Sequence, residues 1–300
     1  MAKLLICDSV DVQAVDAMRA AGVVVDVRDT ITADELAQVI GEYDGIVVRS
    51  RTKVRAPVLQ NPGKLKVIIR GGVGVDNIDV AVAESKGIKV LNTPAASSNA
   101  VAELALAMMF ALARHLAWAD ASMKAGRWEK KNLEGSEIAG KTLGIIGYGH
   151  IGQRLAEQAR ALGMTVVACD PYIQNAALVS LDELLARADY VSLHVPYAPK
   201  THNLLGAAQL AMMKPGACVI NAARGGVVDE DALYAALVSG HLAGAALDVF
   251  TAEPPQSATL RALIALPQVV ATPHIGAATV EAQERIGGEI VALVQEYLVA

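Results

Sequence analysis

The chain has 300 residues, of which 53% are hydrophobic and 19% charged, and its net charge is −5. This composition is typical of a globular protein, and the lack of a basic excess disfavours a nucleic-acid partner. A chain of this length predicts two domains of about 100 to 200 residues. The longest apolar stretch, residues 100–114, is shorter than the roughly 20 residues that span a bilayer. We therefore expect a cytoplasmic protein with no membrane partner.

The cysteines, Cys7, Cys169 and Cys218, each lie in an apolar, strand-like stretch. Their spacing does not match that of metal ligands, so buried thiols in a reducing compartment are expected, and no metal site.

The first ninety residues alternate between short β-branched runs and helical patterns. Strands are predicted at residues 3–8, 23–27, 45–50, 65–70 and 88–93, and helices at 11–22 and 32–43. This alternation is typical of a parallel α/β domain.

A long helix is predicted from about Asn99 onwards and is followed by a polar stretch at 121–140. The alternation then restarts, with strands predicted at 142–148, 165–170, 190–195, 218–223, 244–250 and 269–274, and helices at 153–163, 181–188, 207–213 and 230–240. The last helix, 279–300, has no strand after it and is expected to pack on the first domain. The predicted domains are therefore 1–97 plus 280–300, and 98–279.

Gly147, Gly149 and Gly152 form a G-x-G-x-x-G pattern directly after a predicted strand and directly before an amphipathic helix. These glycines permit a tight turn, a close approach to a pyrophosphate and close packing of the helix on the strand. Asp170 ends the next strand, where a carboxylate can accept hydrogen bonds from an adenosine ribose. Residues 171–175 contain no arginine for a 2′-phosphate, so the pattern favours NAD over NADP.

Arg224, Glu253 and His274 each follow a different strand of the second domain. Ligands bind beyond the carboxyl ends of such strands, so these side chains can converge on one site. A histidine can exchange the proton of a hydroxyl group, a carboxylate can fix its tautomer, and an arginine can hold a carboxylate. Taken singly, each of these residues is more simply explained as an ordinary loop or turn residue than as a catalytic one. Together, behind a dinucleotide motif, they favour hydride transfer between NAD and a hydroxy acid.

These residues belong to segments by which the chain resembles the D-isomer-specific 2-hydroxyacid dehydrogenase family over nearly its whole length. The segments are 48–54, 71–79, 91–109, 122–131, 140–152, 221–230, 244–255 and 272–279. The resemblance implies two doubly wound α/β domains, a Rossmann NAD-binding domain inserted into a flavodoxin-like substrate domain. It also implies a homodimer formed through the nucleotide-binding domains, using the 100–114 helix and the segment after it.

The resemblance assigns catalysis to Arg224, Glu253 and His274. It implies that Asp248 lies near the nicotinamide carboxamide and that the backbone N–H groups of Val73 and Gly74 help to bind the substrate carboxylate. The residues expected to contact NAD are Gly147, Gly149, His150, Ile151, Gly152, Asp170, Ala222, Arg224, Asp248 and His274.

Within the family, the chain is most similar to the branch that oxidises D-3-phosphoglycerate to 3-phosphohydroxypyruvate, the first step of serine synthesis. A phosphorylated substrate needs further cations, for which the candidates are Arg49, Arg51, Arg70 and Lys130. Their structural reading is surface charge, and a less basic site would suit glyoxylate or hydroxypyruvate, as in a reductase. An NAD(H)-sensing protein similar to the corepressors of this fold is a further alternative.

The chain departs from the phosphoglycerate branch in two places. The segment at 171–179 is shorter than usual and predicts a reduced wall of the adenosine pocket and weaker NAD binding. The sequence also stops at Ala300 without the regulatory domain of many relatives, so feedback inhibition through such a domain is not expected. The physiological substrate, the preferred direction and the exact oligomer stay open at this point.

Overall fold

The structure is a computed structural model that describes residues 1–173 and 178–299. The chain divides into two compact units, Met1–Ser97 with Ala277–Ala300, and Ser98–Gly276. The chain returns to unit 1 three residues before the predicted boundary at 279/280. The Gln283 amide donates to the carbonyl oxygen of Ala277 at 2.6 Å, which ties this segment to the start of the last helix.

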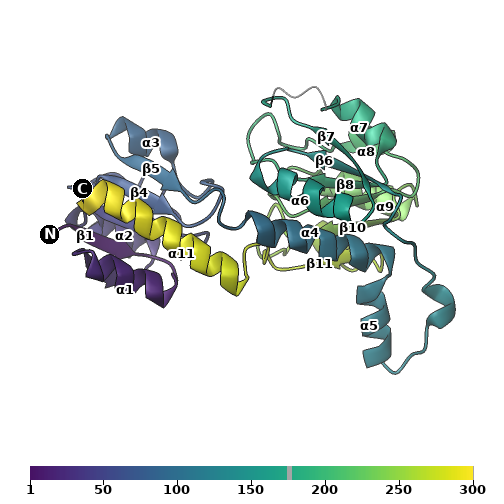
Figure 1. Ribbon diagram of the computed structural model, residues 1–300, viewed down its shortest axis with the longest axis horizontal. Helices are drawn as coiled ribbons and strands as arrows, with labels where there is room; N and C mark the ends of the chain where they lie inside the picture. The colour runs from purple at the N-terminus through teal and green to yellow at the C-terminus, as the bar shows by residue number, and fades with distance from the viewer. Residues whose placement is uncertain (174–177, 300) are drawn as a thin grey trace. The chain divides into compact units, whose positions relative to one another are not determined.

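Unit 1 contains a five-stranded parallel sheet in the order β2-β1-β3-β4-β5 (Figure 1). Its strands are β1 Lys3–Ile6, β2 Val24–Val27, β3 Gly45–Val48, β4 Val67–Arg70 and β5 Lys89–Asn92. This is the flavodoxin-like order, in which successive strands are added first on one side of β1 and then on the other, so that the strand order reverses between β1 and β3.

Helices cover both faces of this sheet. The helices α1 (Val12–Ala20) and α11 (Val280–Val294) pack on one face with Leu4 and Ile6, and a π-helical turn, Gln295–Val299, follows α11. On the other face lie α2 (Ala33–Val39), the 3-10 turn Ile40–Glu42 and α3 (Val80–Ser85). The helix α3 was not predicted from the sequence.

Unit 2 contains a six-stranded parallel sheet in the order β11-β10-β9-β8-β6-β7. Its strands are β6 Thr142–Ile146, β7 Thr165–Cys169, β8 Tyr190–Leu193, β9 Cys218–Asn221, β10 Gly244–Leu247 and β11 Val269–Ala271. The order in which successive strands are added to the sheet reverses between β6 and β8. Open α/β sheets bind their ligands at such a switch point. The glycine turn follows β6 and therefore lies at this switch point.

Two groups of helices bury the faces of this second sheet. On one face lie α4 (Ser98–Ala113) and α6 (His150–Ala161), which enclose one apolar core. The opposite face is covered by α7 Leu181–Arg187, α8 Ala207–Met212, α9 Glu230–Val238 and α10 Ala258–Ile264. The helix α10 was not predicted from the sequence.

The predicted long helix after Asn99 is broken. His115 has a φ of 52°, in the left-handed region, so α4 ends and a separate helix, α5 (Leu116–Lys124), begins. The helix α5 and the loop that carries the 3-10 turn Lys130–Asn132 extend away from the sheet of unit 2 (Figure 1). Among the described residues no single helix is long and apolar enough to cross a membrane, and α4 and α5 reach that length only as a pair bent by 66°.

Candidate active site

The glycine turn after β6 is closely packed at two of its three glycines. Gly147 has a φ of 93°, and a Cβ atom there would lie 2.5 Å from the carbonyl oxygen of His194. A Cβ atom on Gly152 would lie 2.2 Å from the carbonyl oxygen of Gly147. Both positions therefore require glycine for packing alone.

Gly149 differs, because a Cβ atom there would have no protein atom within 4 Å. It is the N-cap of α6, and as a glycine it provides no side-chain cap for the first turn of that helix. Among the described residues, the N–H groups of His150, Ile151 and Gly152 therefore begin the helix without a side-chain cap. An open glycine beside the positive end of a helix fits the pyrophosphate of a dinucleotide.

The Asp170 carboxylate is fixed at the end of β7. Its two oxygens accept hydrogen bonds from the backbone N–H groups of Tyr148, at 2.8 Å, and Tyr172, at 2.9 Å. The carboxylate is thus held beside the glycine turn, as a ribose acceptor requires. The predicted shortening at 171–179 falls partly on residues 174–177, which lie outside the described residues.

Arg224 lies in a turn after β9 that follows the buried Ala222. The Asn221 side-chain amide donates to the carbonyl oxygen of Arg224 at 2.9 Å, and the Arg224 guanidinium donates to the carbonyl oxygen of Ala223 at 2.7 Å. A Cβ atom on Gly225 would lie 2.0 Å from the carbonyl oxygen of Phe250. The glycine therefore lets the Arg224 turn approach the loop that carries Glu253.

Glu253 and His274 form a pair. The Nδ1 atom of His274 lies 2.8 Å from Oε2 of Glu253, and the two side chains are 37% and 39% exposed. Burial acts to raise the pKa of Glu253, but the hydrogen bond and charge of His274, the N–H group of Phe250 and the charge of Arg224 outweigh it and lower this pKa. The structure thus brings together the three residues that the sequence singled out.

Asp248 is 1% exposed and follows β10. Its carboxylate accepts hydrogen bonds from residues of the 272–276 loop, whereas the expected contact with a nicotinamide carboxamide stays a prediction.

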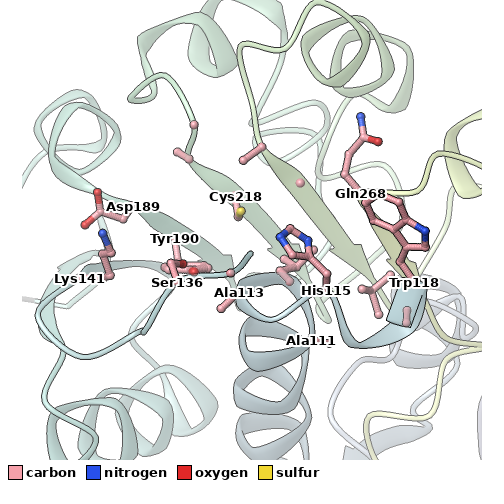
Figure 2. Close-up of a pocket in the computed structure, with 18 of the residues that line it drawn as sticks. Ala111, Ala113, His115, Trp118, Ser136, Lys141, Asp189, Tyr190, Cys218 and Gln268 are labelled. Carbon is pink, nitrogen blue, oxygen red and sulfur yellow. The ribbon is translucent and has the colours of Figure 1, made fainter. Parts of the chain in front are cut away.

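Two cavities of unit 2 differ in their relation to this site. One, of about 410 Å³, lies beside the Glu253–His274 pair and has apolar walls that include Phe250 and Ile264. The other, of about 420 Å³, lies at the amino ends of the strands, at the opposite edge of the sheet. Figure 2 shows Asp189 and Lys141 at one end of this second cavity. It contains none of the predicted catalytic residues.

Arg49 and Arg51, the predicted phosphate ligands at the end of β3, are engaged within unit 1. The Arg49 guanidinium donates to the side-chain oxygen of Gln283, and burial lowers the pKa of Arg49 against the opposing effect of Asp8. Arg51 donates to the carbonyl oxygens of Cys7, Asp29 and Ile31, and it lies 3.0 Å from a carboxylate oxygen of Asp8. Both terminal nitrogens of Arg51 thus donate to protein oxygens.

The remaining predicted substrate residues are spread over both units. Arg70 ends β4 in unit 1. Its guanidinium packs against Gly72, because a Cβ atom on Gly72 would lie only 1.5 Å from one of its nitrogens. Val73 and Gly74 follow in a loop, which the Asn92 amide braces by donating to the carbonyl oxygen of Val73 at 2.5 Å. Lys130 is exposed in the 3-10 turn after α5, in unit 2.

Sequence reasoning did not single out His194, which follows β8 at the switch point. Burial lowers its pKa to about 4, and one ring nitrogen lies 2.9 Å from the Ser192 hydroxyl. A histidine in an apolar strand gives no signal that distinguishes this position from an ordinary core residue.

The parallel sheet carries a glycine turn at its switch point. An imidazole–carboxylate pair and an arginine lie beyond the ends of three other strands. Together these features define an NAD-dependent oxidoreductase. Comparison with known proteins identifies the family. The model of the D-isomer specific 2-hydroxyacid dehydrogenase NAD binding domain matches residues 106–276.

Known proteins are similar over both units. A hydroxypyruvate reductase of Thermotoga maritima is 52% identical, over 86% of each chain. A D-3-phosphoglycerate dehydrogenase of Methanocaldococcus jannaschii is 45% identical over 99% of this chain, which spans 58% of that protein. The solved structure of a D-lactate dehydrogenase from Aquifex aeolicus, complexed with NAD and lactic acid, is 31% identical, with a TM-score of 0.86 over 99% of this chain and 96% of that one.

The chain therefore belongs to the D-isomer specific 2-hydroxyacid dehydrogenase family, and NAD is its cofactor.

Proposed function

We propose that the chain catalyses the NAD-dependent interconversion of D-3-phosphoglycerate and 3-phosphohydroxypyruvate. The observation that carries the reaction class is the 2.8 Å contact between His274 and Glu253, in loops adjoining the turn of Arg224. The substrate is inferred from relatives such as the phosphoglycerate dehydrogenase that is 45% identical over 99% of this chain.

His274 is the proton acceptor in this proposal. Its Nδ1 atom is occupied by Glu253, so Nε2 takes the hydroxyl proton of the hydroxy acid. Glu253 fixes the tautomer that leaves Nε2 as the acceptor, and its negative charge stabilises the imidazolium that forms. NAD, when bound, supplies the acceptor for the hydride that leaves the same carbon.

Arg224 is the anchor for the substrate carboxylate. Its guanidinium is planar and permanently charged, and it matches a carboxylate in two parallel hydrogen bonds. The hydrogen bonds of Asn221 and the close approach of Gly225 to Phe250 hold the turn that presents it.

The reduction of unphosphorylated hydroxypyruvate is a second candidate. It is supported by the 52% identity to a hydroxypyruvate reductase. It is also favoured by Arg51, because both terminal nitrogens of its guanidinium already donate to backbone carbonyl oxygens and one of them lies 3.0 Å from the Asp8 carboxylate.

The test follows NADH by its near-ultraviolet absorbance with 3-phosphohydroxypyruvate, hydroxypyruvate and glyoxylate, and then NAD with D-3-phosphoglycerate. A preference for the phosphorylated acid supports the first candidate, and a preference for hydroxypyruvate moves the protein to the second. His274→Gln should abolish turnover on every acid. Full activity of this variant would contradict the assignment of the base.

We also propose that the protein is a homodimer through α4, α5 and the loop after them. Leu116, Met123 and Trp128 are 52%, 57% and 78% exposed there. Such a group of apolar side chains in contact with water is unusual on the surface of a monomer. Sedimentation equilibrium tests this proposal. Polar substitution of Met123 and Trp128 should give a monomer if this surface is the interface.

A further inference from the structure

The loop that carries His274 has an unfavourable backbone conformation. His274 has a φ of 56°, in the left-handed region, which is unfavourable for a residue other than glycine. Such a conformation persists only where surrounding contacts impose it. The contacts that hold residues 272–276 therefore decide where the imidazole lies.

One buried residue makes these contacts. Oδ1 of Asp248 accepts hydrogen bonds from the Thr272 hydroxyl at 2.6 Å and from the N–H group of Ile275 at 2.8 Å. Its Oδ2 accepts from the N–H group of Gly276 at 2.8 Å. The backbone carbonyl oxygen of Asp248 accepts from the N–H group of His274 at 2.9 Å. Asp248 thus receives four hydrogen bonds from one loop, on both sides of the histidine.

The chemistry of the site requires a carboxylate at this position. An ionised carboxylate has only acceptor atoms, and three donors converge on it. An amide would present N–H hydrogens to at least one of these donors. A Cβ atom on Gly276 would lie 3.2 Å from Oδ2 of Asp248, so glycine lets the loop come this close.

We propose that Asp248 is a positioning residue that holds the 272–276 loop so that the His274 ring meets Glu253. The proposal rests on the proposed function, since it concerns the residue that acts there as the base. It assigns Asp248 a role separate from contact with the nicotinamide carboxamide. Loss of the carboxylate should lower turnover and disturb the tautomer of His274, and both effects are separate from any loss of NADH affinity.

The experiment compares Asp248→Asn with Asp189→Asn. Asp189 is a matched control, because its carboxylate accepts from the N–H group of Thr142 and from Lys214 at the opposite edge of the same sheet. Three quantities are measured: kcat with the best 2-oxo acid, the NADH dissociation constant by fluorescence, and the His274 tautomer from imidazole ¹⁵N shifts at alkaline pH. The His274→Gln variant identifies the signals of this ring.

We expect Asp248→Asn to lower kcat by about 100-fold, the effect of displacing a catalytic group by about 1 Å. The single His274 tautomer should become a mixture, and the NADH dissociation constant reports separately on any contact of Asp248 with the nicotinamide carboxamide. The Asp189→Asn variant should keep kcat and the tautomer even where it lowers thermal stability. An unchanged tautomer in Asp248→Asn, or a loss confined to NADH affinity, overturns the proposal.

A milder pair keeps the test decisive if Asp248→Asn does not fold. Thr272→Val removes one donor to Asp248 with little change in shape, whereas Thr272→Ser retains the hydroxyl. The Thr272→Val variant should have a lower kcat and a mixture of His274 tautomers. The Thr272→Ser variant should keep the wild-type kcat and the single tautomer. Equal behaviour of the two variants contradicts the proposal. The tautomer measurement needs no substrate, so it stays informative even if the wild-type protein reduces none of the tested acids.

Discussion

The Glu253→Gln variant tests the pair on which the proposed chemistry depends. The substitution keeps the size of the side chain but removes the charge that faces Nδ1 of His274 at 2.8 Å. The glutamine carbonyl oxygen can still accept a hydrogen bond. The variant therefore isolates the electrostatic stabilisation of the imidazolium from the geometry of the loop.

The distance between Glu253 and His274 sets the size of the electrostatic energy that the variant loses. At 2.8 Å the attraction of two unit charges is about 1.5 kcal/mol in a medium like bulk water and about 6 kcal/mol at an effective dielectric constant of about 20. Because both side chains are more than a third exposed, solvent screening favours the lower part of this range. We take about 1.5 to 3 kcal/mol, which predicts a fall in kcat of about 10- to 150-fold.

The assay measures kcat in the direction in which the imidazolium forms, at saturating NAD and D-2-hydroxy acid, with the NAD dissociation constant measured separately. Glu230→Gln is the control, because Glu230 accepts from the N–H group of Thr251 in the same loop without contacting His274. This control should keep kcat within about twofold. If Glu253→Gln also kept kcat within twofold, the role of Glu253 as the partner of the base would be wrong.

Three further predictions follow from single residues. Gly149→Ala should weaken NADH binding without loss of thermal stability, since its Cβ atom meets no protein atom within 4 Å, whereas Gly152→Ala should lower stability as well, because its Cβ atom would lie 2.2 Å from a carbonyl oxygen. Burial, followed by the hydrogen bond to a carboxylate, raises the pKa of Tyr43 from 10.0 to about 12. The stability that this buried phenol contributes is therefore present below pH 10 and is lost as the pH rises towards 12, so melting temperatures should fall over that interval and Tyr43→Phe should flatten the fall. Burial raises the pKa of the Cys7 and Cys218 thiols to about 12, so a thiol reagent at neutral pH should label neither until the protein is unfolded.

Much of the candidate site could be predicted from the sequence, because parallel strands end at one edge of their sheet. Gly147, Asp170, Arg224, Glu253 and His274 each follow a strand that the apolar runs of the sequence had predicted. Their alignment along one edge follows from the period of the fold and requires no knowledge of side-chain contacts.

Other features had no sequence signal. The helices α3 and α10 were not predicted, and the break at His115 depends on a left-handed residue inside a helical pattern. The place of Arg51 after a strand made it a candidate phosphate ligand, which stays a prediction, whereas the three carbonyl oxygens that accept from its guanidinium had no sequence signal.

The sequence by itself determined the class of this protein, since the alternation of strands and helices, the glycine spacing and the residues at strand ends are local or periodic properties. Only the tertiary structure decided which groups meet. The hydrogen bonds of Asp248 to the His274 loop join residues more than twenty positions apart. Such contacts arise from the packing of β10 beside β11, which no local pattern encodes.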